Sequence, residues 1–476
     1  MSIRHRLQKT KIIATIGPAC DDESVLRDMI SEGVSVARLN LSHGDFEQHA
    51  ERITRVRRAA DAVGVNLAIM IDTRGREIRT GKLEGGSVTL APGQEFTLYT
   101  DERLGNAEGV AVSHDTLHDH VSLRDRVLLD DGLIGLSVSG ISLGVIRCRV
   151  ENGGTLHDRK GVNLPDNPNI FESIDSDVGG DLEFVADQEA EYVAASFIRD
   201  AADIERLRSK LTELGADTPI IAKIESRDGV KNLDEIIAVA DGTMVARGDL
   251  GVELDLAQGP TIQKRIIRST VTNGKPVITA TQMLDSMERN PRPTRAEVSD
   301  VANAILDGTS AVMLSGETAV GAYPVESVRT MVRLAREAEA GLREFGHLQQ
   351  ILPHPANVVT EAVAQASITM ANHLKAVAII ALTETGFTSR LISKYRPDCP
   401  ILAVTASPRV VRRLAMNWGV LAMHYEGDGT DDDKLAFATD RAKASGYARP
   451  GDIIVATAGS QRQAGSTDLI RVLTVE

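Results

Sequence analysis

The sequence predicts an α/β protein: a (β/α)8 TIM barrel with an inserted β-barrel domain and a C-terminal α/β domain. Three observations support this prediction. Eight short apolar segments alternate with amphipathic helical segments, one long gap in the alternation is rich in strand patterns, and the alternation resumes after about residue 355. Eight successive β-α units favour a barrel. A doubly wound open sheet remains the alternative, because counting strands does not distinguish the two.

The eight predicted barrel strands are short apolar runs with frequent Val, Ile and Ala, mostly bounded by Gly, Pro or polar residues. They cover residues 11–17, 34–42, 66–73, 191–197, 219–226, 243–248, 276–282 and 310–316. Helical patterns follow nearly every strand: DESVLRDMISEG after the first, DAADIERLRSKLTELG after the fourth and TIQKRIIRSTVTNG after the sixth. We therefore assign residues 1–73 and 161–345 to the barrel domain.

Two further domains are expected from the pattern outside these units. Within residues 74–160, the stretches SVTLAPGQEFTLYT, RVLLDDGLIGLSV and GVIRCRVEN, divided by Gly and Asn turns, predict antiparallel strands. Residues 346–476 begin with the helical pattern NVVTEAVAQASITMANHL and continue with the strand patterns AVAIIALT, PILAVTAS, DIIVATA and IRVLTVE. About 120 residues is a usual domain size, so we expect a separate α/β domain there.

Composition excludes several classes of protein. The 476 residues are 42% hydrophobic and carry a net charge of −14, which argues against a general nucleic-acid-binding surface. No apolar run approaches the roughly 20 residues that span a membrane, and the basic N-terminus lacks a signal-peptide core. Cys20, Cys148 and Cys399 lie too far apart to suggest a disulfide framework or a zinc motif. We expect a cytoplasmic protein that binds neither nucleic acid nor membrane.

Polar and charged residues gather where the predicted barrel strands end. The C-terminal ends of barrel strands form the functional face of this fold. Five predicted strands, the second, third, fifth, sixth and seventh, bring such residues to one rim. They are Arg38, Asn40, Ser42, His43, Asp72, Thr73, Lys223, Glu225, Gly248, Asp249 and Thr281.

The residue types at this rim suit phosphoryl or enolate chemistry. Glu225 and Asp249 come from adjacent strands, and two carboxylates suit a Mg²⁺ ion that keeps waters and takes substrate oxygens; the alternative is a pair of solvated acids. Lys223 points to the same side of its strand as Glu225. It would neutralise a phosphoryl group or an enolate oxygen, or form a structural salt bridge. Gly248 admits a ligand to the backbone or serves a turn that needs positive φ. We expect Arg247 to brace the rim or a neighbouring subunit.

Longer blocks of the chain resemble the pyruvate kinase family over essentially the full length. They are KIIATIGPA, VARLNLSHGD, IDTRGREIRTG, DRKGVNLP, ASFIR, AKIES, MVARGDLGVE, ITATQMLDSM, NPRPTRAEVSDVANAILDGTSAVMLSGETAVGAYP and GSTDLIRVLTVE. The short blocks are weak singly, but ATQMLDSM followed by PTRAEVSDVANAILDG is specific. The resemblance implies transfer of the phosphoryl group of phosphoenolpyruvate to ADP, giving pyruvate and ATP in the final step of glycolysis.

The resemblance also implies roles for the substrate-binding residues. Arg38 would contact the substrate phosphate, and Lys223 would stabilise the transferring phosphoryl group and the enolate. The backbone at Gly248 and Asp249, with the Thr281 hydroxyl, would hold the substrate carboxylate. Thr281 would also lie in the proton path to the enolate carbon.

The same resemblance implies which residues bind the ions and the nucleotide. Glu225 and Asp249 would hold Mg²⁺ (or Mn²⁺), and Glu77 matches the family members that depend on K⁺. The expected K⁺ ligands are Asn40, Ser42, Asp72 and the Thr73 carbonyl. Groups that would serve the nucleotide ATP or ADP are Arg79, Lys160, His43 and Asn40.

The chain departs from the family pattern at the entrance to the inserted domain. Gly75-Arg76 stands where the family usually has Gly-Pro, and Arg74 stands where it has Lys or Gln. Loss of a rigid proline bears on closure of the inserted domain as a lid.

A second departure concerns regulation. The family's effector loop usually carries a phosphate-binding cation, and here Phe387 occupies that place. Hydroxyls and a helix N-terminus still bind phosphate, so a phosphorylated effector (a sugar phosphate or a nucleotide) remains one reading and a plain turn the other. The candidate effector residues are Thr383, Thr385, Gly386 and Thr388. The resemblance also suggests a homotetramer.

Two other functions compete with this reading. A metal-dependent barrel lyase or aldolase would share the two rim acids, but it needs no nucleotide-binding residues such as Arg79. A catalytically silent homologue would be expected to lack Lys223, Glu225 or Asp249, and all three are present. We expect His114, His118 and His120 to be exposed loop residues rather than a metal site.

Overall fold

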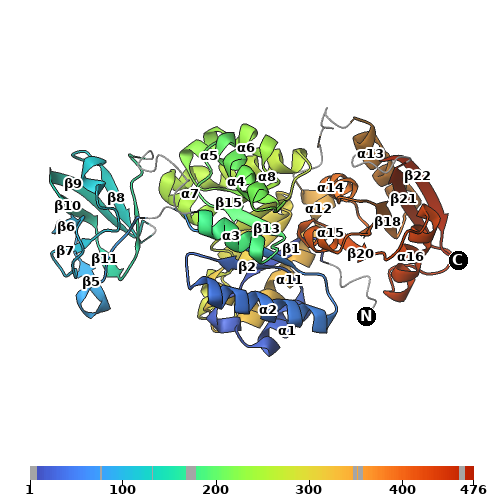
Figure 1. The fold of residues 1–476 in the computed structure, drawn as a ribbon, viewed down its shortest axis with the longest axis horizontal. Coiled ribbons are helices and arrows are strands. Elements are labelled where there is room, and N and C mark those ends of the chain that lie inside the picture. The colour runs from blue at the N-terminus through green and yellow to red at the C-terminus, as the bar shows by residue number, and fades with distance from the viewer. Residues whose placement is uncertain are drawn as a thin grey trace.

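The computed structural model describes residues 8–75, 78–130, 132–167, 178–346, 351, 358–459 and 467–476. Three bodies lie in a row (Figure 1): the inserted β domain at one end, the barrel in the centre and the C-terminal domain at the other end. None of the described helices combines the length and the apolar run that crossing a membrane requires.

Eight parallel strands close the central barrel in the order β1-β17-β16-β15-β14-β13-β3-β2. Each of them overlaps one predicted strand, so the barrel is confirmed and the open sheet is excluded. The strands are β1 (Lys11–Thr15), β2 (Val34–Asn40), β3 (Ala68–Asp72), β13 (Tyr192–Ala195), β14 (Ile220–Ile224), β15 (Gly242–Ala246), β16 (Val277–Ala280) and β17 (Ala311–Leu314).

The sixth strand ends earlier than predicted. It was expected to run to Gly248, but β15 ends at Ala246 and a short helix begins at Arg247. The last parallel pairing of β15 joins Ala246 to Ala280, the last residue of β16. The backbone beyond this point has no strand partner, and the Gly248 N–H instead donates to the Thr281 hydroxyl.

Helices surround the barrel as the sequence pattern predicts. Local signals fix several of their starts: the Asp22 and Asp45 side chains cap the first two helices, and Thr294 with Glu297 forms a capping box. The helices are α1 (Glu23–Glu32), α2 (Phe46–Val63), α3 (Gly179–Asp187), α4 (Ala201–Glu213), α5 (Arg227–Lys231), α6 (Leu233–Val239), α7 (Arg247–Glu253), α8 (Gly259–Thr272), α9 (Arg295–Leu306), α10 (Gly316–Ala319), α11 (Pro324–Ala340) and α12 (Leu342–Phe345).

The barrel strands are buried on both faces. Side chains inside the barrel, such as Ile13, Met70 and Met244, form one apolar cluster, and those outside pack against the helices. Met416, from the C-terminal domain, joins the interior cluster. The C-terminal domain therefore packs against the N-terminal ends of the strands.

The inserted domain is built on a seven-stranded sheet of order β4-β12-β8-β9-β10-β6-β7, with β11 and β5 paired beside it. The predicted stretches pair antiparallel, as expected; the unpredicted β7 pairs parallel with β6. A bridge between Thr80 and Val112 joins the two edges of the sheet into a barrel. The strands are β4 (Ile78–Arg79), β5 (Ser87–Leu90), β6 (Glu95–Tyr99), β7 (Gly109–Ala111), β8 (Arg126–Leu129), β9 (Ile134–Ser142), β10 (Val145–Asn152), β11 (Gly154–His157) and β12 (Gly161–Asn163).

The C-terminal domain holds a five-stranded sheet of order β20-β19-β18-β21-β22, in which β21 and β22 pair antiparallel. The strand β20 was not predicted, because GVLAMHY is short and only its first residue is fully buried. The elements are α13 (Val358–Leu374), β18 (Ala378–Leu382), α14 (Phe387–Lys394), β19 (Ile401–Thr405), α15 (Pro408–Arg413), β20 (Val420–His424), α16 (Asp431–Ala444), β21 (Ile453–Gly459) and β22 (Thr467–Thr474).

Candidate active site

Strand register brings the predicted rim residues of β2 and β3 together. Asn40 lies opposite Asp72, and Arg38 lies opposite Thr15 of β1. Arg38 donates from Nε to Asp72 Oδ2 at 2.7 Å and from Nη1 to the Thr15 hydroxyl at 3.1 Å. Arg38 and Asp72 are both buried, so this pair holds the guanidinium in place at the rim.

Lys223 is the centre of the charged cluster. Its Nζ lies 2.7 Å from Glu225 Oε1 and 3.1 Å from Asp72 Oδ1. Burial alone would lower the pKa of Lys223, but the charges of Asp72, Glu225 and Asp249 outweigh it and raise that pKa. Lys223 therefore remains a cation across the physiological pH range.

Asp72 is ionised for the complementary reason. Burial alone would raise its pKa, but the charges of Arg38 and Lys223, together with their hydrogen bonds, hold the pKa below its usual value. The cluster thus combines three carboxylates (Asp72, Glu225 and the half-buried Asp249) with two cations, leaving a surplus of negative charge if all are ionised.

One carboxylate oxygen of Glu225 accepts a hydrogen bond, and the other has only the charge of Lys223 nearby. Oε2 accepts the Phe197 N–H at 2.8 Å. Oε1 is buried and accepts no hydrogen bond, although Lys223 Nζ lies close to it. A buried carboxylate oxygen without a hydrogen bond retains a lone pair for a hard cation.

Ser196 belongs to this cluster, and the sequence analysis missed it. Its hydroxyl accepts a hydrogen bond from Lys223 Nζ at 2.8 Å and donates to the Thr73 carbonyl at 2.9 Å. The block ASFIR marked the segment, but the strand pattern did not distinguish Ser196 from the residues beside it. Its position directly after β13 was the available signal.

The rim backbone is strained at three residues. Phe197 (φ 55°), Thr281 (φ 66°) and Gln282 (φ 52°) adopt the left-handed conformation. This conformation is unfavourable for side chains other than glycine, and most so for a β-branched residue such as Thr281. All three follow barrel strands at the functional face, where strained backbone often accompanies function.

Arg247 holds the strained loop after β16. Its Nε donates to the carbonyls of Ala280 and Thr281, both at 3.1 Å, and its Nη1 pairs with Asp300 at 2.6 Å. The expectation that Arg247 braces the rim is confirmed. The bracing also explains why a charged residue directly follows a buried strand.

Gly248 and Thr281 meet across the rim. The Gly248 N–H donates to Thr281 Oγ1 at 2.9 Å, and that hydroxyl donates to the Ala280 carbonyl at 2.7 Å. Gly248 does not have a positive φ, so the turn alternative is wrong. A Cβ at Gly248 would approach no atom closer than 3.9 Å, which leaves open space beside this backbone.

The expected potassium ligands lie side by side. Asn40 Oδ1 accepts the Ser42 N–H at 3.2 Å in a short turn, and the Thr73 carbonyl faces the Ser196 hydroxyl. Neither Asn40 nor Ser42 caps a helix, because the cap of α2 is Asp45. Glu77 and Arg76 lie outside the described residues.

Of the expected nucleotide residues, only Asn40 lies beside the Lys223 cluster, opposite Asp72. Arg79 and Lys160 lie on the inserted domain, which stands apart from the barrel (Figure 1). Lys160 Nζ pairs with Asp130 at 2.9 Å, and Arg79 Nη1 donates to the Arg159 carbonyl at 3.1 Å. His43 is exposed on the loop after β2.

Arg74 anchors the entrance to the inserted domain. It contacts the buried Asp181 through its N–H at 2.7 Å and through Nε and Nη2 at 2.8 and 2.6 Å. Gly75 is required next to it, because a Cβ there would lie 2.1 Å from the Phe197 ring. Arg74 and Gly75 are thus both held in place by their contacts.

The candidate effector loop is largely satisfied by its own contacts. The Thr383 hydroxyl accepts the Gly386 N–H at 2.9 Å, and Gly386 has a φ of 81°. The buried Thr388 hydroxyl meets the Thr467 hydroxyl at 2.5 Å, whereas Thr385 is exposed. These contacts are those of a strand-to-helix turn, with one exposed hydroxyl in front of α14.

The three clustered histidines of the inserted domain, His114, His118 and His120, are only partly as expected. His120 is exposed, but His114 and His118 are half-buried. The rings of His114 and His120 meet edge to face, with centroids 5.6 Å apart. Over the described ranges, no group of three or more His, Cys, Asp or Glu side chains is arranged to hold a metal ion.

Comparisons with known proteins agree along nearly the whole chain. Two family models match: "Pyruvate kinase, barrel domain" over residues 7–328 and "Pyruvate kinase, alpha/beta domain" over residues 361–473. A pyruvate kinase of Bacillus licheniformis is 45% identical over 98% of this chain and 81% of its own length. One of Geobacillus stearothermophilus is 46% identical over 98% and 80%. One of Clostridium acetobutylicum is 42% identical over 99% and 100%.

Proposed function

The chain belongs to the pyruvate kinase family and transfers the phosphoryl group of phosphoenolpyruvate to ADP, giving pyruvate and ATP, and we propose that the rim cluster around Lys223 carries out this transfer. The observation that carries the proposal is the surplus of carboxylates around Lys223, with Glu225 Oε1 lacking a hydrogen bond. Such a site attracts a divalent cation together with an anionic substrate.

Arg38 and Lys223 have the charge and the position to hold the transferring group. Phosphoryl transfer depends on alignment and charge neutralisation more than on covalent chemistry. Arg38 is fixed by Asp72, and Lys223 keeps its proton because its pKa is raised. We assign Arg38 to the substrate phosphate, and Lys223 to the phosphoryl group and the enolate oxygen that forms as it leaves.

Mg²⁺ fits Glu225 and Asp249. Magnesium usually binds through one or two carboxylates, with waters and substrate oxygens completing its shell. Glu225 supplies a buried oxygen without a hydrogen bond, and Asp249 lies in the first turn of the short helix α7 nearby. When bound, the ion would neutralise phosphoryl oxygens; Mn²⁺ would suit the same donors.

Gly248, Asp249 and Thr281 would receive the substrate carboxylate. The space beside Gly248 and its N–H are available once the Thr281 hydroxyl turns away from it. The Thr281 hydroxyl already donates a hydrogen bond to a neighbouring carbonyl, so it is a suitable member of the path that delivers a proton to the enolate carbon.

Potassium would bind next to this cluster. The proposed ligands are Asn40, Ser42, Asp72 and the Thr73 carbonyl, the last of which Ser196 links to Lys223. We propose that Glu77 makes the enzyme dependent on K⁺.

The inserted domain was predicted to span residues 74–160, but β12 extends its sheet to Asn163. This domain would act as a lid that brings Arg79 and Lys160 to the nucleotide. Arg74 and Asp181 would fix the hinge. Asn40 ends β2 and His43 follows it on the next loop, so both lie on the rim of the barrel. Because lid closure completes such sites, the separation of the inserted domain from the barrel in Figure 1 is compatible with an open form.

Three properties rest on the family alone. They are a homotetramer, a cytoplasmic location and a phosphorylated effector at Thr383, Thr385, Gly386 and Thr388. The satisfied contacts of Thr383 and Thr388 weaken the last of these.

The test is pyruvate formation from phosphoenolpyruvate and ADP with Mg²⁺, with and without K⁺, in the wild type and in Lys223→Met. We expect K⁺-stimulated turnover that falls at least about a thousandfold in the variant. Lys264→Met, which removes a lysine paired with Asp307 on the outside of the barrel, is the matched control and should keep normal turnover.

Each outcome separates the claims. Turnover without K⁺ would retain the enzyme and refute the role of Glu77. Normal turnover in Lys223→Met would refute the assignment of the site. No turnover in the wild type, with phosphoenolpyruvate binding intact, would favour the catalytically silent homologue.

A further inference from the structure

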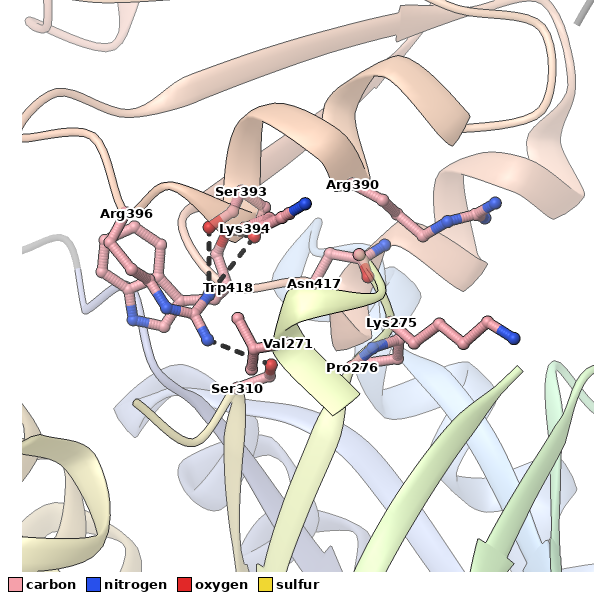
Figure 2. Close-up of a pocket in the computed structure, with 11 residues that line it drawn as sticks. Val271, Lys275, Pro276, Ser310, Arg390, Ser393, Lys394, Arg396, Asn417 and Trp418 are labelled. Atoms are coloured by element: carbon pink, nitrogen blue, oxygen red, sulfur yellow. Dashed lines mark hydrogen bonds between the residues drawn. The ribbon is translucent and has the colours of Figure 1, made fainter. Parts of the chain in front are cut away.

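A second charged pocket lies at the other end of the barrel, between the N-terminal ends of its strands and the C-terminal domain (Figure 2). Lys275 and Ser310 line it from the barrel, just before β16 and β17. Arg390, Arg396, Asn417 and Trp418 line it from the C-terminal domain. About 220 Å³ of empty space lies within and in front of it, including open solvent.

The pocket is rich in positive charge. Lys394 also lines it, but this lysine is fully buried in an ion pair with Glu361. Within the described part of the chain, Lys275, Arg390 and Arg396 form no ion pair with a carboxylate. Lys275 Nζ donates to the carbonyls of Ile237 and Ala238, at 2.5 and 2.9 Å, and Arg396 Nη2 donates to the Gly308 carbonyl at 2.6 Å. Carbonyls satisfy hydrogen bonds but do not neutralise charge.

Arg390 is the least satisfied of the three. Among the described residues, its guanidinium takes part in no hydrogen bond, and its Cζ lies 5.7 Å from the centroid of the Phe387 ring. Figure 2 shows Arg390 and Lys275 extending in the same direction, with Asn417 between them. Asp241 is the carboxylate whose negative charge acts on both Lys275 and Arg390. It already accepts hydrogen bonds from Arg208 and from the Ile220 N–H, both at 2.9 Å.

Burial makes these unneutralised charges unfavourable. It lowers the pKa of Lys275 to about 8 and that of Arg396 to about 9, and it also lowers the pKa of Arg390. A buried cation without a counter-ion is destabilising, and a bound anion would offset that cost.

We propose that this interdomain pocket binds a small oxyanion: a phosphate group, either free or carried by a small phosphate monoester. Arg390 offers a planar fork of N–H donors, Lys275 a point charge, and Asn417 an amide donor between them. The site is separate from the catalytic rim, because it lies at the opposite ends of the barrel strands. A bound anion would contact the barrel and the C-terminal domain at once.

Trp418 provides the readout. It is the only tryptophan in the chain, it lines the pocket, and Arg396 lies over its ring at 4.7 Å. The experiment is a titration of the whole enzyme with inorganic phosphate at constant ionic strength, followed by tryptophan fluorescence. We expect a saturable change that sodium chloride does not reproduce.

Variants locate the binding. Arg390→Gln should weaken phosphate binding at least about tenfold, since charge-assisted bonds to arginine are strong. Arg409→Gln is the matched control, because Arg409 lies at the same domain interface but pairs with Asp217; it should bind as the wild type does. Lys275→Met is a second pocket variant, used if Arg390→Gln does not fold.

The remaining outcomes decide the proposal. Equal affinity in the wild type and in Arg390→Gln would overturn it. So would a signal that Lys223→Met abolishes, since that would place the phosphate at the catalytic rim. If sodium chloride reproduced the fluorescence change, the change would be an effect of ionic strength, and the proposal would be overturned. Once the variants have located the site, the affinities for glycerol 3-phosphate and inorganic phosphate are compared. If glycerol 3-phosphate binds tenfold more tightly, the ligand is a phosphate monoester. If it binds equally or more weakly, the ligand is free phosphate.

Discussion

Two buried glutamates, Glu225 and Glu191, lie at opposite ends of the barrel and have nearly the same contacts. Glu225 follows β14 at the C-terminal face, accepts the Phe197 N–H at 2.8 Å and pairs with Lys223 at 2.7 Å. Glu191 precedes β13 at the N-terminal face, accepts the Ile69 N–H at 2.8 Å and pairs with Arg412 at 2.5 Å. Local bonding alone would therefore assign both to the same structural role.

The difference lies in what surrounds each pair. Lys223 is shared among several carboxylates, and its neighbourhood includes the strained Phe197 and Thr281. Arg412 comes from the C-terminal domain, and both oxygens of Glu191 are engaged. A surplus of like charge and strained backbone are unfavourable for folding and useful for ligand binding. These features, rather than burial, separate the end that carries the chemistry from the end that joins two domains.

The largest expected effect separates the two glutamates directly. Glu225→Gln removes a proposed Mg²⁺ oxygen, so turnover should fall about a thousandfold or more. Glu191→Gln should leave turnover within about twofold but lower the free energy of unfolding by about 2 kcal/mol, because it weakens a charged hydrogen bond. Steady-state kinetics and urea unfolding of both variants test this.

A thousandfold loss in both variants, or in neither, would remove the functional contrast between the two ends. A Mg²⁺ titration sharpens the result. Glu225→Gln should require more Mg²⁺ for half-maximal activity, whereas Glu191→Gln should not.

Two lysines at opposite ends of the barrel, Lys223 and Lys11, extend the comparison to pH. The pKa of Lys223 is raised, but burial lowers that of Lys11, whose Nζ donates to the Val420 carbonyl at 2.8 Å, to about 8. Between about pH 8 and the ordinary lysine pKa of about 10.4, the unfolded chain binds more protons at Lys11 than the folded chain does. Stability from this group therefore rises with pH in that window, by up to about 3 kcal/mol.

Urea unfolding at pH 7.5 and pH 9.5 measures that rise. Lys11→Met should reduce it, because methionine does not titrate. Lys223 contributes no loss there, since its raised pKa keeps the stabilising charge until more alkaline pH. Parallel pH profiles in the wild type and in Lys11→Met would contradict the prediction.

The two ends also differ in how far they could be predicted from sequence. The rim was predictable because Arg38, Asp72, Lys223 and Glu225 stand at the ends of regular apolar runs, and strand period and barrel geometry then place them together. The N-terminal end was not predictable. Its contacts join Glu191 to Arg412 and Lys11 to Val420, residues that are hundreds of positions apart and follow no local period.

Two further misses have local causes. Ser196 carries no signal of its own, because a serine after a strand is common and its partners come from other strands. The end of β15 was placed too late, since Arg247 and Gly248 continue a strand-like pattern while their hydrogen bonds go to the next loop.

Two serines at opposite ends of the barrel, Ser196 and Ser310, should differ moderately in their effect on turnover. Ser196→Ala removes a hydrogen bond to Lys223 Nζ and frees the Thr73 carbonyl, so turnover should fall about tenfold and the K⁺ requirement should rise. Ser310→Ala, at the other end, removes a hydroxyl that accepts from Arg396 at 3.2 Å and should leave turnover unchanged. Kinetics at several K⁺ concentrations test both; equal effects would refute the role of Ser196.

The smallest expected effect concerns strain. Gln282 and Glu189 are both exposed and both left-handed, with φ of 52° and 48°, but they lie at opposite ends of the barrel. Glycine relieves the steric cost in each while adding unfolded-state entropy, so each variant should be stabilised by about 1 kcal/mol or less. Turnover should change only in Gln282→Gly, because the Gln282 backbone belongs to the loop that Arg247 holds around Thr281. Thermal unfolding and turnover, measured together, test this. If Glu189→Gly lowered turnover as much as Gln282→Gly, strain at the rim would have no special link to function.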